Sequence, residues 1–110
     1  MNVFAVSNVS AVQILQRRRL DLASELLKTL AAPVRLALLV VLNSGPRCVH
    51  ELVDELGVSQ PLVSQHLRVL RAARLVEAER RGREVVYRLV DEHVAEIVEA
   101  AIRHSEEDRK

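Results

Sequence analysis

Residues 48–73 carry the pattern that most restricts how this chain can fold. In the first part of this stretch, apolar residues recur at the i, i+3, i+4 and i+7 spacing of an amphipathic helix, at Val49, Leu52, Val53 and Leu56. Gly57 then predicts a tight turn, and Ser59 is a suitable N-cap for a second helix over about residues 59–73. Two short helices joined by a short, glycine-containing turn predict a helix-turn-helix.

The second of these helices has one apolar side and one polar side. Val63, Leu67 and Leu70 are predicted to face inward, and we interpret the nearby His66 as a packed, hydrogen-bonded histidine. Amide and hydroxyl groups can read base edges, and arginine can hold guanine or phosphate. Any surface helix has a polar face, but this one contains no acidic residue, which favours a helix that faces DNA. The candidate DNA-binding residues on it are Gln60, Ser64, Gln65, Arg68 and Arg71.

Residues from about 75 to about 89 are predicted to form a β-hairpin. The expected strands run from Leu75 to Glu79 and from Glu84 to Leu89, and the second is rich in β-forming residues. Between them, Arg80-Arg81-Gly82-Arg83 is expected to form the turn, because glycine permits a positive φ. Arginines at a protruding tip can reach phosphates or a minor groove, although charged turns are also common on ordinary surfaces. The candidate DNA-binding residues of the hairpin are Arg80, Arg81 and Arg83.

A helix-turn-helix followed by such a hairpin is a winged helix, so the predicted fold class is mainly α with a β-hairpin wing. The 110 residues suggest one domain, over about residues 11–108, preceded by a flexible arm at 1–10. A first helix is expected from about Val12 to Leu30. Pro33 suits the first turn of a second helix, which is apolar on nearly every side and is therefore predicted to be central and buried. The run Asn43-Ser44-Gly45-Pro46 is expected to end it.

Residues from about 91 to about 107 are predicted to form a C-terminal amphipathic helix that carries metal ligands. Its apolar stripe consists of Val94, Ile97, Val98, Ala101 and Ile102. At the edge of this stripe, His93 and His104 fall within about 20° of each other on a helical wheel. Asp91 precedes the first histidine and Glu107 follows the second by one turn. Carboxylate and imidazole are ligands for first-row metals, so the candidate metal site is Asp91, His93, His104 and Glu107.

The spacing of these residues also predicts a homodimer. Eleven helical residues separate the two histidines by about 16 Å, whereas ligand atoms lie only about 2.0–2.2 Å from zinc. Two antiparallel copies packed through this apolar stripe would bring Asp91 and His93 of one beside His104 and Glu107 of the other, giving two equivalent sites. Taken singly, each residue also has an ordinary explanation: Asp91 as a helix N-cap, and His104 with Glu107 as a solvated pair.

The charge of the chain is unevenly distributed. The formal net charge is +1, but residues 68–88 contain seven arginines against three glutamates, and residues 91–108 contain seven acids against one arginine. A basic middle suits phosphates, and an acidic tail suits cations. No nucleophile or phosphate-binding loop accompanies the histidines, so neither enzymatic activity nor a small-molecule substrate is predicted.

Cys48 is the single cysteine, so an intrachain disulfide is excluded and a reducing, cytoplasmic location is expected. No apolar run is long enough to cross a bilayer, and the N-terminal apolar stretch lacks a basic flank, so neither a membrane nor export is predicted.

From about Leu26 to Glu107 the chain resembles the ArsR/SmtB family of metal-sensing repressors. Leu30-Ala31-Ala32-Pro33-Val34-Arg35-Leu36 is similar to the start of the family's second helix. Ser59-Gln60-Pro61-Leu62-Val63-Ser64-Gln65-His66-Leu67 is similar to its recognition helix, and Gly82-Arg83-Glu84-Val85-Val86-Tyr87 to its wing. Asp91-x-His93 and His104-x-x-Glu107 match the interfacial zinc site of the zinc-sensing branch.

This resemblance implies a repressor that is homodimeric through its N- and C-terminal helices. Its apo form would bind an inverted-repeat operator in double-stranded DNA, and zinc at the dimer interface would release it. The family's other site begins with a cysteine motif, of which Cys48-Val49-His50 keeps one cysteine, while the arm contains neither cysteine nor histidine. The resemblance therefore favours a four-coordinate N₂O₂ site for Zn²⁺, with Co²⁺ as a substitute, and leaves Cys48 as a structural, half-buried thiol. The alternative is a repressor of the same fold that is constitutive or responds to oxidation of Cys48.

Overall fold

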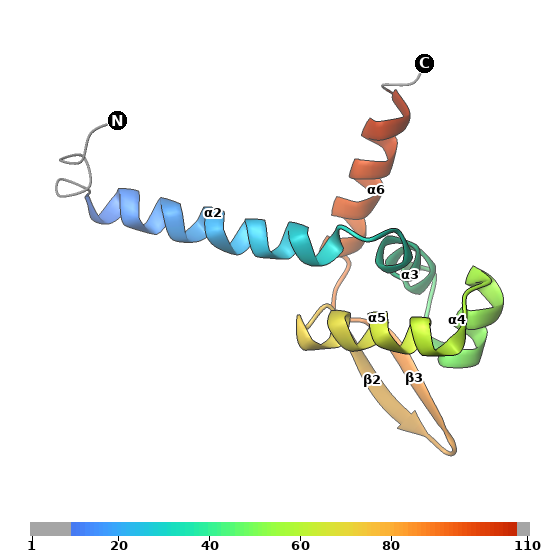
Figure 1. Ribbon diagram of the computed structural model, residues 1–110. Coiled ribbons are helices and arrows are strands. Elements are labelled where there is room, and N and C mark those ends of the chain that lie inside the picture. The colour runs from blue at the N-terminus through green and yellow to red at the C-terminus, as the bar shows by residue number, and fades with distance from the viewer. Residues whose placement is uncertain (1–9, 108–110) are drawn as a thin grey trace.

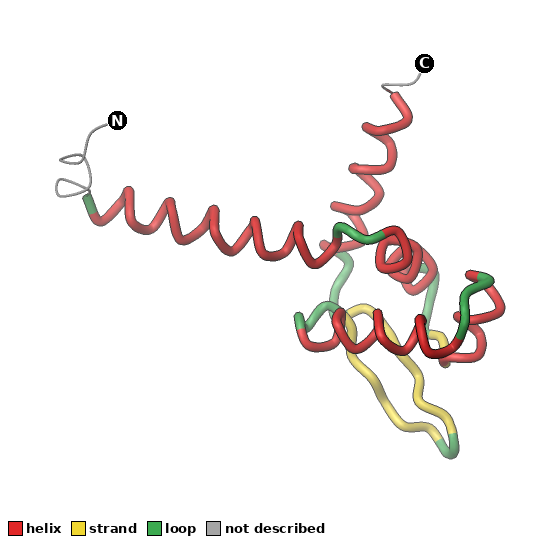
Figure 2. The backbone as a smooth tube through the Cα atoms, in the orientation of Figure 1, coloured by secondary structure: helices red, strands yellow, loops and turns green. Residues whose placement is uncertain are grey.

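The computed structural model describes residues 10–107, which form five helices and a three-stranded sheet (Figures 1 and 2). In chain order the elements are α2 (Ala11–Leu30), α3 (Pro33–Asn43), β1 (Arg47–Cys48), α4 (Val49–Leu56), α5 (Gln60–Ala72), β2 (Val76–Arg81), β3 (Glu84–Leu89) and α6 (His93–Glu107). The predicted helix-turn-helix is thus α4 and α5, and the predicted wing is β2 and β3. Of the predicted arm, residues 1–9 lie outside the described residues.

Local signals set most helix ends. Ser10 and Gln13 form a reciprocal capping box at the start of α2, and Pro33 occupies the first turn of α3. Gly57 ends α4 in the left-handed conformation, with φ of 66°. Ser59 lies at the N-cap position of α5 as predicted, but its side chain makes no capping hydrogen bond.

The sheet differs from the expected two-stranded hairpin in two respects. The strand order is β1-β3-β2, all antiparallel, so Cys48 belongs to a short strand and not to the following helix. A strand of two residues has no periodicity by which a sequence could reveal it. Arg80 and Arg81 lie in β2 and not in the turn, because they pair with Val85 and Glu84 and lengthen the ladder. The turn is reduced to two residues, of which Gly82 has φ of 64°.

The core surrounds α3, whose Leu38 and Leu39 are completely buried. The inward residues predicted for α5 are confirmed, since Val63, Leu67 and Leu70 are all at most 1% exposed. From α6, Val94 and Val98 join the same cluster. The other buried members are Leu30, Leu42, Leu52 and Val76.

The apolar stripe of α6 is therefore divided, and does not face a second copy as a whole. Val94 and Val98 pack within the chain, whereas Ile97 and Ile102 are each 37% exposed. The physical reason is position on the helix: Ile97 lies about 60–100° round the helix from the two buried valines, and Ile102 lies one turn beyond Val98, nearer the end of α6.

Helix α2 extends away from the rest of the molecule (Figure 1). Leu30 at its end is its buried residue, and Leu26 packs partly on the core. Its exposed apolar residues are Val12, Ile14, Leu15, Leu20, Leu22 and Leu27. In the described part of the chain, no helix has the length and apolar character needed to cross a membrane.

Gly57 provides a test of the helix-turn-helix geometry. A Cβ added there would meet nothing within 4 Å, so any effect of substitution comes from the backbone conformation alone. We expect Gly57→Ala to lower the free energy of unfolding by about 1–2 kcal/mol, and Gly57→Asn by less, because asparagine tolerates the left-handed region. Urea denaturation at a fixed protein concentration measures both. An alanine variant as stable as the wild type would contradict the assigned turn.

Candidate DNA-binding surface and metal sites

The outward side of α5 is polar, as predicted. Gln60, Gln65, Arg68 and Arg71 are exposed, and Ser64 is half-buried beside the core. The inward leucines and valine hold this helix on α3 and α4, so the polar side chains project from a fixed support. In the described residues, Arg68 and Arg71 have no acidic partner, which leaves their charges available to phosphate.

His66 is half-buried and hydrogen-bonded, as predicted, and its partner is Arg35 of α3. The Nη1 of Arg35 lies 3.2 Å from Nδ1 of His66. The Nε of the same guanidinium donates to the carbonyl oxygen of Thr29, 2.5 Å away, at the end of α2. Because arginine can only donate, the facing His66 nitrogen must be the acceptor. One side chain thus ties α2 and α5 to α3.

The wing arginines differ in how much of their charge is neutralised. Arg81 lies 3.3 Å from a carboxylate oxygen of Glu79. Arg88 lies 2.8 Å from Glu77, and this hydrogen bond, together with the charge of the glutamate, raises the pKa of the guanidinium. Across the described chain, Arg80 and Arg83 form no ion pair, so they are the wing's available cations.

The four candidate metal ligands of α6 lie in two separated pairs. Nδ1 of His93 is 3.4 Å from Oδ1 of Asp91, and the same oxygen accepts the backbone N–H of His93 at 2.9 Å. Asp91 lies one residue before the N-cap position, which Glu92 occupies, but its side chain still accepts one of the free N–H groups at the start of the helix. His104 and Glu107 lie at the end of the helix. His104 follows His93 by eleven residues, and each residue adds about 1.5 Å along the helix axis, so the two pairs are far apart. A single α6 thus carries one pair of candidate ligands near each end.

The face of α6 that points away from the core carries both histidines. Taking about 100° per residue, His93, Ile97, Ala100 and His104 lie within about 60° of arc, between about 100° and 160° from the core-facing Val98, and Ala101 borders this side. All five are exposed. Two of them are alanines, which allow the axis of another helix to approach closely.

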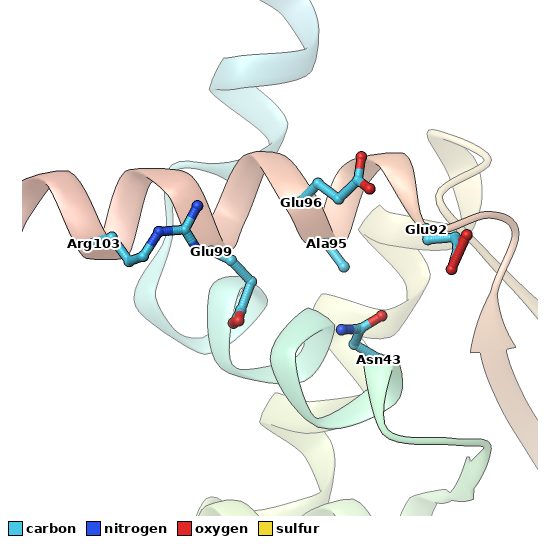
Figure 3. Close-up of a pocket in the computed structure, with 6 residues that line it drawn as sticks. All are labelled: Asn43, Glu92, Ala95, Glu96, Glu99 and Arg103. Atoms are coloured by element: carbon cyan, nitrogen blue, oxygen red, sulfur yellow. The ribbon is translucent and has the colours of Figure 1, made fainter.

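The cavities near α6 do not contain this ligand set. One cavity of about 300 Å³ lies between α6 and the end of α3, and Figure 3 shows the residues that line it: Asn43, Glu92, Ala95, Glu96, Glu99 and Arg103. Asp91 lines a neighbouring cavity together with Asn43 and Glu92. None of the described cavities joins both halves of the candidate site.

A second group of ligand-type residues was missed by sequence reasoning. Cys48, His50 and Glu84 place a sulfur, an imidazole nitrogen and a carboxylate oxygen within 4.8 Å of one another. The sequence separates the glutamate from the other two by more than thirty residues. The pairing of β1 with β3 is what brings them together, and no local pattern predicts it.

Cys48 is only 5% exposed, so it is buried and not half-buried as predicted, and burial raises the pKa of its thiol. Glu51 accepts hydrogen bonds from the backbone N–H of Cys48 at 2.9 Å and from its sulfur at 3.2 Å, and these bonds lower the pKa of the Glu51 carboxyl. A thiol held protonated reacts slowly with oxidants, because the thiolate is the nucleophile. This environment weighs against oxidation of Cys48 as the regulatory signal.

These features define a winged helix-turn-helix DNA-binding protein. The model of the family described as "Bacterial regulatory protein, arsR family" matches residues 32–78. The HTH-type transcriptional repressor SmtB of Mycobacterium tuberculosis is 60% identical over 92 residues, which cover 84% of this chain and 68% of that protein. The chain belongs to the ArsR family and is a transcriptional repressor of the ArsR/SmtB group.

Solved structures agree with this assignment. The transcriptional repressor BigR from Xylella fastidiosa has a TM-score of 0.72 at 40% identity, covering 77% of this chain and 87% of that one. The homodimeric winged helix-turn-helix domain of Mb0332 from Mycobacterium bovis, a possible ArsR-family regulator, also has a TM-score of 0.72, at 30% identity, covering 84% of this chain and 86% of that one. The family and these relatives are DNA-binding regulators and not enzymes.

The raised pKa of Cys48 predicts slow alkylation. Because the protonated thiol is favoured in the folded state, the stability this provides is complete below the ordinary thiol pKa and is lost as the pH rises through the higher folded value. We expect the rate of reaction with iodoacetamide to keep rising above pH 9 in the native protein. In urea the rate should level off nearer the ordinary thiol value. If the rate in the native protein levelled off at a lower pH than the rate in urea, the result would contradict this environment.

Proposed function

We propose that this repressor responds to zinc. In this proposal the apo homodimer binds an inverted-repeat operator, and zinc bound between the two α6 helices releases it. The observation that carries the proposal is the outward face of α6, where His93 and His104 flank exposed apolar and small residues. Asp91 lies beside His93, and Glu107 follows His104 by about one turn of the helix. Half a site at each end of one helix becomes two complete sites when an antiparallel copy is added.

The homodimer is supported by the exposed apolar surface of α2. Helix α2 packs on its own chain only at its end, so most of it lacks the tertiary packing from which most helix stability in proteins comes. Its exposed residues include Val12 at 73% and Leu22 at 63%, and apolar surface of this extent favours a protein partner. A second copy that covers α2 and the outward face of α6 together would bury both surfaces. The similar domain of Mb0332 is homodimeric, which also supports a dimer.

The donor atoms suit zinc. Asp91 and His93 of one copy, with His104 and Glu107 of the other, would supply two nitrogens and two oxygens, a set that zinc and cobalt accept. Asp91 uses one carboxylate oxygen to accept the backbone N–H of His93, which leaves its second oxygen for the metal and fixes the carboxylate next to the imidazole of His93. When bound, the ion would hold the two α6 helices in one relative position.

DNA would be contacted by the polar side of α5 and by the wing. Gln60, Ser64 and Gln65 would read base edges, and the arginines would hold guanine or phosphate. The phosphate-binding set would be Arg68, Arg71, Arg80 and Arg83, and Arg81 would join it by exchanging its ion pair with Glu79 for a phosphate. In a dimer, the two recognition helices would enter major grooves about 34–36 Å apart or a multiple of that distance.

The core provides the connection between the metal and DNA. Val94 and Val98 of α6 pack on the same cluster as α3 and α5, and a close-packed interior transmits displacement because it has little free volume. Arg35 adds a polar link from α3 to His66 on the recognition helix. A zinc-fixed position of α6 would therefore change the relative placement of the two α5 helices. By linkage, DNA must weaken zinc binding by the factor by which zinc weakens DNA binding.

Replacement of one histidine tests the metal part of the proposal. We expect His104→Ala to dimerise and bind operator DNA as the wild type does, but not to be released by zinc, because each site loses a nitrogen ligand. Glu106→Gln, in the same helical turn, is the matched control and should still be released. Fluorescence anisotropy with labelled DNA from upstream of the gene measures both. Release of the His104→Ala complex by zinc would place the sensing site elsewhere, and release by peroxide alone would favour the Cys48 alternative.

The DNA surface is tested by the salt dependence of binding. Replacing an arginine that binds phosphate should weaken binding and lower the slope of log K against log salt concentration by about one per arginine replaced. We expect this for Arg68→Ala and Arg83→Ala. Arg88→Ala is the control, because its guanidinium is already paired with Glu77. Equal effects in all three variants would contradict the assignment of α5 and the wing tip.

A further inference from the structure

We propose that Arg74, in the turn between α5 and β2, is a further DNA contact, which binds a backbone phosphate beyond the bases that α5 reads. The inference rests on the DNA-binding surface proposed above and extends it by one residue in each subunit. It is carried by the backbone conformation of Arg74, by the charges that lie beside it, and by the lack of an acidic partner for it in residues 10–107.

Arg74 has a backbone conformation that arginine rarely adopts. Its φ is 63°, and within residues 10–107 it is the one residue other than glycine with a positive φ. Gly57, which ends α4, has φ of 66°, so both helices of the helix-turn-helix are followed by the same left-handed conformation. Glycine adopts this conformation without steric cost, whereas the Cβ of other residues comes too close to a carbonyl oxygen. Position 74 is therefore strained when it holds arginine.

Hydrogen bonds on both sides of Arg74 fix this conformation. The N–H of Leu75 donates to the carbonyl oxygen of Leu70 at 2.9 Å. The N–H of Arg74 donates to the carbonyl oxygen of Arg71, also at 2.9 Å. These two bonds form a Schellman motif, which places its left-handed residue at position 74. The carbonyl oxygen of Leu75 accepts the N–H of Val90 at 3.1 Å, so the base of the wing is held as well. The conformation is thus imposed by the fold, whatever side chain is present.

The packing of the subunit gives no reason for an arginine at this strained position. Arg74 is exposed, and its side chain forms no ion pair or hydrogen bond with residues 10–107. Strained residues gather at functional sites, where the surrounding structure maintains them. The structural alternative is that a cation near the end of α5 interacts favourably with the helix dipole. The two explanations differ in what they predict for DNA binding.

The charges beside Arg74 favour an anion. A cavity of about 390 Å³ lies at the junction of α5 with the base of the wing (Figure 1), and its lining residues are Arg71, Arg74, Val76, Glu77, Ala78 and Val90. The carboxylate of Glu77 is already engaged, since it lies 2.8 Å from Nε of Arg88. Arg71 and Arg74 are left as cations without an acidic partner in the described residues. Guanidinium groups bind phosphate oxygens through charge-assisted hydrogen bonds.

Arg74 also continues a series of cations that begins within α5. The last of the proposed base-reading groups is Gln65, and the exposed Arg68 and Arg71 follow it. Arg74 comes three residues later, just past the end of the helix, and residues 60–76 contain no acidic residue. A phosphate contact at this end would fix the orientation of α5 in the groove, since contacts to phosphate position a protein on DNA without reading its sequence.

Substitutions at position 74 separate the charge from the strain. Arg74→Ala removes the charge and keeps the strain, Arg74→Gly removes both, and Arg74→Lys keeps both and is the matched control. We expect the alanine and glycine variants to bind DNA more weakly, with the slope of log K against log salt concentration lowered by about one per arginine removed. The lysine variant should keep the wild-type slope. Fluorescence anisotropy with labelled upstream DNA over a series of salt concentrations measures all three.

A phosphate contact also predicts the same loss on every DNA sequence. In Arg74→Ala and Arg74→Gly, the affinities for upstream DNA and for an unrelated duplex should fall by the same factor. A larger loss on upstream DNA would assign Arg74 to a base edge and overturn the phosphate contact. A wild-type salt slope in both variants would overturn any contact with DNA.

Protein stability shows whether weaker binding comes from a lost contact or from a damaged fold. We expect Arg74→Gly to melt a few degrees above the wild type, because glycine relieves the left-handed strain, and yet to bind DNA more weakly. Damage to the fold cannot produce this combination. If the arginine served the helix dipole alone, Arg74→Gly would melt below the wild type and keep its salt slope, and the proposal would be wrong.

Arg68→Ala separates this inference from the DNA-binding surface on which it rests. If Arg68→Ala lowers the salt slope and the variants at position 74 do not, only the contact assigned to Arg74 is wrong. If none of them lowers the slope, the DNA-binding surface proposed on α5 is wrong as well.

Discussion

The packing of three helices on α3 is the interaction on which the rest of the structure depends. Leu38 and Leu39 of α3 are fully buried, and the apolar sides of α5 and α6 meet there with that of α4. Removal of these side chains from water is the main favourable term in folding. It also decides orientation, because the side of α5 that is not buried is the side left for DNA, and the side of α6 that is not buried carries the histidines.

This shared core makes a small protein suitable for regulation. The recognition helix α5 and the candidate metal-binding helix α6 pack on the same core around α3, so neither can move independently of that core. Arg35 strengthens the connection by bonding the end of α2 and His66 of α5 at once. The surfaces that remain apolar and exposed, on α2 and on α6, are those that the proposed second copy would cover.

The two groups of ligand-type residues differ in how the fold places them. The candidate ligands of α6 lie near the two ends of one helix and would need another chain to meet, whereas Cys48, His50 and Glu84 already lie together within one subunit. A metal between subunits would act on the relation of the two recognition helices.

The sequence by itself determined the features that depend on neighbours along the chain. Helical periodicity predicted the buried residues of α5, Pro33 and Gly57 marked helix ends, and β-forming residues around a glycine predicted the wing. Only the tertiary structure decided the features that depend on distant segments: the β1 pairing, the cluster completed by Glu84, the bond between Arg35 and His66, and the division of the α6 stripe. The physical reason is that periodicity fixes which side of an element is apolar, whereas the partner of each side depends on how the elements pack in space.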